Sequence, residues 1–280
     1  MGRFRPRRSF KHAPTLRGEL LGSMPAWKRE AEGLSQKLHD RWSTLHLHCA
    51  DASSHPRLAR LVRRLTHVDY GVRESAIAEL ELATQLIHAG VRVRLLPESQ
   101  ARTADLECYT DYDRFFVEVT AMVGSAERQR LPVRGLESEE IIGEEDRGVI
   151  LIHRILARIR QKAKQVAGYC DPVVLSISVP RADLQGDKYG RADPIWLDLK
   201  VLAGLVTVLL TSVPTLGAVM IAMRDVEPLP SRSALRLANV ELIERAKHER
   251  TQPRVCMLIQ NPRATAPLSA RQEDAIRQTL

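Results

Sequence analysis

Residues 172–179 form an almost continuous apolar run, and this run constrains the fold more than any other part of the chain. A strand that is apolar on both sides must be covered on both faces, as the central strands of parallel sheets are. An amphipathic helical pattern at about 147–168 precedes the run. A buried helix at about 197–211 and another apolar strand at 218–223 follow it. The chain is therefore predicted to be an α/β protein with a mixed central sheet flanked by helices.

The residues before this run add one helix and three strands. Apolar residues recur at helical spacing from Arg73, and Gly90 provides the stop signal. Three short strands are predicted at 91–96, 104–109 and 114–120. Towards the end of the chain, residues 233–247 are predicted to be helical and residues 255–259 to be a last strand. The predicted order is α-β-β-β-α-β, followed by further helix and strand.

An uncharged segment at 201–223 is long enough to span a bilayer. Pro214 and Gly217 interrupt it, so a buried helix, a turn and a buried strand are expected instead, and no membrane is expected as a partner. The four cysteines are scattered without a C-x-x-C pair, which argues against a disulfide framework and against a zinc knuckle. A cytoplasmic location with reduced thiols is the expectation.

Positive charge is concentrated near the start of the chain. Residues 1–70 contain 14 Lys and Arg against 6 Asp and Glu, a net charge of +8 that equals the net charge of the whole chain. We expect a disordered basic arm at 1–25, a helical basic N-terminal extension at 26–70 and one α/β domain at 71–280. A basic arm on a neutral body suggests nucleic acid or another polyanion as partner, and a solubilising tail is the alternative.

The two strands at 104–109 and 114–120 form a predicted hairpin that places carboxylates together. Without a bulge, residues whose numbers sum to 223 face each other, so Asp105 lies opposite Glu118. Glu107 and Thr120 share their face, and apolar residues occupy the other. Two facing carboxylates repel each other unless a cation lies between them. Either a hard divalent ion or a nearby Arg or Lys on a solvated face meets this need.

These elements resemble the core of the PD-(D/E)XK nuclease superfamily, whose restriction-endonuclease-like fold has the order α-β-β-β-α-β. Glu79 precedes Gly90 by eleven residues, as a glutamate of that family's first helix often does. Asp105 matches the aspartate of the second strand, and Glu118-Val-Thr120 matches E-x-K of the third. The following helix contains Gln165 and Tyr169 in a Q-x-x-x-Y pattern, as in the RecB-like branch.

The resemblance implies a divalent-metal-dependent nuclease that uses Mg²⁺ or Mn²⁺ and acts on DNA. Its implied metal ligands are Glu79, Asp105, Glu118 and the carbonyl of Val119. The motif's proline is Ala104 here, and its catalytic lysine is Thr120, which can position water but carries no charge.

The resemblance also implies roles on the following helix. Lys162 or Lys164 would supply the missing charge, and Gln165 and Tyr169 would position the substrate backbone.

Two other functions stay open. Loss of the lysine is also expected of a catalytically inactive nucleic-acid-binding or assembly module, which would work with a partner ATPase or as a homodimer. Alternatively, the chain is an α/β interaction protein in which the motif arises by chance.

Overall fold

The computed structural model describes residues 31, 34–49, 54–97, 104–122, 144–179, 195–230, 238–246 and 252–280. The helices are α3 (Gln36–His48), α4 (His55–Leu65), α5 (Tyr70–His88), α6 (Glu144–Gln165), α7 (Leu199–Thr211) and α8 (Ala270–Arg277). The strands are β1 (Arg92–Leu95), β2 (Leu106–Thr110), β3 (Asp113–Ala121), β4 (Val173–Val179), β5 (Ile195–Leu197), β6 (Ala218–Met223), β7 (Val226–Pro228), β8 (Val240–Glu244) and β9 (Val255–Gln260). The predicted arm at 1–25 lies outside the described residues.

Seven strands form one mixed sheet in the order β1-β2-β3-β4-β6-β9-β8, and β5 pairs with β7 separately. The central strands β3, β4 and β6 run parallel, while the pairs at both edges are antiparallel. The predicted buried strand is therefore the middle strand of the sheet. Its burial on both faces explains why its sequence is apolar almost throughout.

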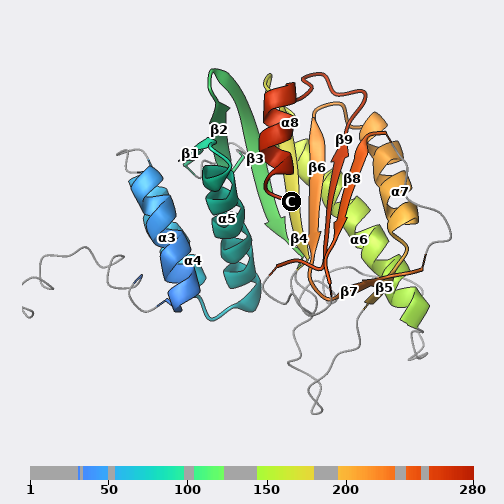
Figure 1. The fold of residues 1–280 in the computed structure, drawn as a ribbon, viewed down its shortest axis with the longest axis horizontal. Helices are drawn as coiled ribbons and strands as arrows, with labels where there is room; N and C mark the ends of the chain where they lie inside the picture. The colour runs from blue at the N-terminus through green and yellow to red at the C-terminus, as the bar shows by residue number, and fades with distance from the viewer. Residues whose placement is uncertain are drawn as a thin grey trace, which may run out of the picture.

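Helices cover both faces of the sheet (Figure 1). On one face, α3, α4, α5 and α8 enclose one apolar core, and on the other face α6 and α7 enclose a second. Alternate residues of β4 enter the two cores: Val174 belongs to the first and Leu175 to the second. The mixed α/β sheet with flanking helices is confirmed.

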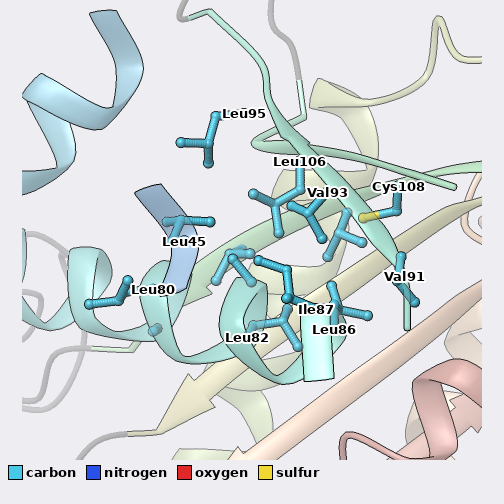
Figure 2. Packing of buried hydrophobic residues seen from close by; sticks show 14 of the residues in the cluster. Leu45, Leu80, Leu82, Leu86, Ile87, Val91, Val93, Leu95, Leu106 and Cys108 are labelled. Atoms are coloured by element: carbon cyan, nitrogen blue, oxygen red, sulfur yellow. The ribbon is translucent and has the colours of Figure 1, made fainter. Parts of the chain in front are cut away.

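The first core forms where α5 packs on β1 and β2. Figure 2 shows the apolar side chains of α5, among them Leu86 and Ile87, facing those of the two strands. Asp69 is the N-cap of α5, and its side chain accepts a hydrogen bond from the Val72 backbone nitrogen. Gly90 follows its end with a φ of 81°, a conformation that glycine adopts without steric cost. The predicted helix stop is confirmed.

The prediction of a helix at 233–247 is wrong where it can be checked, because residues 240–244 form strand β8. Val240 and Leu242 lie two positions apart, as on one face of a strand, and pack against the second core, whereas Ile243 is exposed. Pairing with β9 then decides the conformation. The short strands β5 and β7 were not predicted, and neither was α8, although Ser269 and Gln272 form a capping box at its start.

The uncharged segment at 201–223 divides as predicted into helix α7, a turn and strand β6. Asn261 stabilises the turn, because its side-chain nitrogen donates hydrogen bonds to the carbonyls of Val213 and Leu216 at 3.1 and 2.8 Å. Among the described helices, none has the length and apolarity needed to cross a membrane.

Candidate functional site

The hairpin of β2 and β3 has the predicted register. Leu106 pairs with Val117 and Thr110 with Asp113, so paired residue numbers sum to 223 as expected. The Asp105 backbone nitrogen donates to the carbonyl of Val117 at 3.0 Å, which continues the ladder and places Asp105 beside Glu118. The Val119 backbone nitrogen also donates to Asp105 Oδ2 at 2.9 Å. This backbone contact fixes the carboxylate at the end of the hairpin.

The polar face of the hairpin is buried, so it is not the solvated face that was one of the alternatives. Helix α6 packs on this side of the sheet, and only 2% of the Glu118 side chain is exposed. Thr120, two residues further along β3, is also buried. Glu107 is buried too, but it accepts a hydrogen bond from the Tyr109 hydroxyl at 2.8 Å and takes no part in the cluster described next.

Glu118 is paired with a lysine from the helix. Lys162 Nζ lies 2.5 Å from Glu118 Oε1 and 3.2 Å from Gln165 Oε1. Lys164 is exposed on the same helix, so Lys162 is the lysine that reaches Glu118. The second oxygen, Glu118 Oε2, is buried and has no hydrogen-bond partner among the described residues. A buried carboxylate oxygen without a donor is costly, and it is a position that a water or a cation would stabilise.

Glu79 and Asp105 are joined by an arginine that the sequence did not single out. Arg57 Nη2 lies 3.1 Å from Glu79 Oε1 and 2.7 Å from Asp105 Oδ1. Arg64 Nη1 binds the other oxygen of Glu79 at 2.6 Å. We call Glu79, Asp105 and Glu118 the acidic cluster. Its members come from α5, the start of β2 and β3, and its cations come from α4 and α6.

The three carboxylates influence each other's protonation. The pKa of Glu118 is raised to about 7, first by burial and then by the negative charge of Asp105, while Lys162 acts in the opposite direction. The pKa of Glu79 is also raised, first by burial and then by Asp105, against Arg57 and Arg64. Desolvation and mutual repulsion therefore outweigh the ion pairs at both glutamates. A group that binds a proton near neutral pH is well suited to acid–base work or to exchange of a proton for a cation.

Tyr169 has a structural contact next to the cluster. Its hydroxyl accepts a hydrogen bond from the Ala104 backbone nitrogen at 2.8 Å, and its ring packs on Phe116 with 4.3 Å between ring centroids. This contact ties the segment after α6 to the residue before Asp105. Tyr169 therefore helps to place a carboxylate, and its predicted role in positioning a substrate stays a prediction.

Arg57 and Arg64 are the site residues that sequence reasoning missed. Both lie in α4 within the predicted N-terminal extension, 22 and 15 positions before Glu79. The available signal was local. Leu61 lies one turn after Arg57 on the same helix face and is buried. An arginine on a buried helix face must be paired with an acid. Nothing in the local pattern identified which acid it was.

The donor set fits a hard divalent cation by chemistry, although cations of the protein already occupy it. Within the described residues, no three His, Cys, Asp or Glu side chains are arranged so that they could hold a metal ion. The carboxylates of Asp105 and Glu118 are oxygen donors of the kind that Mg²⁺ prefers, and Glu118 Oε2 lacks a donor. The guanidinium of Arg57 separates Glu79 from Asp105.

Comparison with known proteins does not assign the chain to a family. No protein-family model matches it, and no curated protein or solved structure is significantly similar to it. The functional argument therefore rests on the residues of the site.

Proposed function

We propose that the protein is a divalent-metal-dependent nuclease with a restriction-endonuclease-like core, and that DNA is its substrate. The observation that carries this proposal is the meeting of Asp105, Glu118 and Lys162 at the end of the hairpin. Phosphodiester hydrolysis needs groups that hold a cation, a positive charge near the scissile phosphate and a means of handling a proton. The carboxylates of Asp105 and Glu118 would hold the cation, and Lys162 would supply the positive charge.

The order of elements and the position of the lysine support the family resemblance. The chain runs α5-β1-β2-β3-α6-β4, with Glu79 on the first helix and Asp105 at the start of the second strand. Thr120 stands where the motif has lysine, and Lys162 approaches the same glutamate from α6 at 2.5 Å. The charge that Thr120 lacks is therefore available beside Glu118, which favours retained catalysis.

In this proposal, Asp105, Glu118 and the Val119 carbonyl hold Mg²⁺ or Mn²⁺, with Glu79 nearby. A bound divalent cation would lower the pKa of water and stabilise negative charge on the phosphate. Lys162 holds a positive charge next to Glu118, and Gln165 orients it by accepting a hydrogen bond. Thr120 offers a hydroxyl on the same face, which can orient a water molecule.

A cleavage assay tests the proposal. Wild type and Glu118→Ala are incubated with linear and circular DNA, single-stranded DNA and RNA in Mg²⁺, Mn²⁺ or EDTA. We expect the wild type to cut DNA only with metal and the variant not to cut at all. Glu107→Gln is a matched control, because it alters a buried carboxylate of the same hairpin face outside the acidic cluster. Cleavage by Glu118→Ala at the wild-type rate would contradict the site assignment.

A second candidate, a nucleic-acid-binding module without catalysis, is favoured by the charge balance of the site. Three carboxylates are paired with Arg57, Arg64 and Lys162, so the charges of the cluster balance without any metal when all six groups are ionised. Such a module would bind DNA in EDTA as well as in Mg²⁺ and would cut under neither condition. Its affinity would fall steeply with salt, because arginines and lysines release counterions when they bind phosphates.

A further inference from the structure

Five of the six carboxylate oxygens of the acidic cluster already accept a hydrogen bond from the protein. Glu79 gives both oxygens to arginines, Asp105 gives one to Arg57 and one to a backbone nitrogen, and Glu118 gives one to Lys162. Of the six carboxylate oxygens of the acidic cluster, Glu118 Oε2 is the one that has no donor among the described residues. A divalent cation that binds here needs at least two or three oxygen ligands from the protein or from water. A cation that is held by Asp105 and Glu118 together therefore needs at least one oxygen that already accepts a hydrogen bond from the protein.

Arg57 is the residue that most directly opposes the binding of a divalent cation to the acidic cluster. The side chain of Arg57 is 3% exposed, and its Nη2 contacts two carboxylates at once. A guanidinium has five donors and no acceptor, so it cannot become a metal ligand. It also repels a divalent ion at contact distance in a buried site. An ion at Asp105 Oδ1 and the Arg57 guanidinium on the same oxygen would place two positive charges at close range, so the two compete for this carboxylate.

We infer that Arg57 competes with a divalent cation for the oxygens of Glu79 and Asp105, so that α4 of the N-terminal extension controls metal loading of the site. This inference rests on the proposed function, because it concerns the same metal site. Without metal, Arg57 keeps the carboxylates together and neutralised. When metal binds, the Arg57 side chain leaves Asp105.

The rest of α4 stays in place in this exchange. Leu58, Leu61, Val62 and Leu65 are buried in the first core and anchor the helix. Arg57 belongs to the first turn of α4, at the end of the helix, where a side chain can change partner without removing these four residues from the core. Arg64, which lies further along the same helix, keeps its ion pair with Glu79. Control of metal loading is therefore assigned to the Arg57 side chain alone.

Titration of the full chain with Mn²⁺ tests the inference by calorimetry. Arg57→Met removes the competing cation while keeping an unbranched side chain, and we expect it to bind Mn²⁺ at least tenfold more tightly than the wild type. Arg57→Lys keeps a charge but lacks the fork that spans two carboxylates, so its affinity should lie between the two. Arg41→Met is the matched control, because Arg41 pairs with Glu81 on α5, outside the acidic cluster. It should bind Mn²⁺ as the wild type does.

Melting temperatures with and without Mn²⁺ give a second readout. Removal of Arg57 leaves Asp105 without its cation and Glu79 with Arg64 alone, so Arg57→Met should be less stable without metal and should gain more from Mn²⁺ than the wild type. If this variant does not fold, Arg57→Lys decides the question. Equal or weaker Mn²⁺ binding in the folded Arg57 variants would overturn the inference.

The outcome is separable from that of the proposed function. Wild-type cleavage together with unchanged Mn²⁺ affinity in the Arg57 variants would remove the inference and leave the nuclease. Tighter Mn²⁺ binding in those variants without any wild-type cleavage would support the inference and remove the nuclease.

Discussion

The protonation of Glu118 leads to a quantitative prediction for Glu118→Gln. Glutamine resembles the protonated carboxyl in shape and charge at every pH. Glu118 in the folded protein has a pKa of about 7 against an ordinary value of 4.5, because burial and Asp105 outweigh Lys162. Comparison of the two proteins across pH therefore isolates the cost of ionising Glu118 in its site.

The sign follows from the direction of the pKa. A raised pKa means that the folded state binds the proton more tightly than the unfolded state does, so the contribution of Glu118 to stability is complete below pH 4.5. This contribution is lost as the pH rises through 7. A tenfold change in proton affinity corresponds to about 1.4 kcal/mol, so the loss totals about 3 kcal/mol. Glu118→Gln avoids this loss, and its stability relative to wild type should rise by that amount between pH 4.5 and pH 8.5.

Urea denaturation at closely spaced pH values measures the difference directly, provided that the m-value stays constant. Glu241→Gln controls for the loss of one carboxylate, since Glu241 lies in a surface ion pair with Arg277. A difference between wild type and Glu118→Gln that does not change with pH would refute the reasoning. A difference of the opposite sign would show that the ion pair with Lys162 dominates over burial.

Three further substitutions test separate contacts. Tyr169→Phe removes the acceptor of the Ala104 backbone nitrogen and keeps the ring, so unfolding free energy measured in urea should fall by about 1 kcal/mol, whereas no loss would show that the contact is dispensable. Lys162→Met removes the charge beside Glu118 and should lower the cleavage rate by about 10²-fold or more, and an unchanged rate would exclude Lys162 from catalysis. Leu58→Ala opens a cavity under α4 and should cost about 2–5 kcal/mol in the same urea assay; a cost below about 1 kcal/mol would show that α4 is loosely attached.

The hairpin could be predicted from the sequence because its register depends on a short turn. Once the turn lies between Asp111 and Tyr112, the residue opposite Asp105 follows from counting, and the structure has that register. The buried middle strand was equally predictable, because a strand covered on both faces must be apolar. Local periodicity and local geometry were sufficient in both cases.

Long-range contacts account for what the sequence did not predict. Arg57 is separated from Asp105 by 48 positions, and the pair depends on how α4 packs across α5. Strand β8 is an edge strand whose conformation depends on pairing with β9. The burial of Glu118 likewise depends on α6 covering the hairpin face. Each of these outcomes is decided by tertiary packing, which a pattern within one segment does not contain.

A crystal structure grown with Mn²⁺, with anomalous scattering recorded for the metal, tests the central claim that the acidic cluster is a metal centre. The account predicts an anomalous peak for a metal ion that is coordinated by Asp105 and Glu118, with the Arg57 side chain turned away from Asp105. A map without a peak at saturating Mn²⁺, with Arg57 still bridging Glu79 and Asp105, would contradict it.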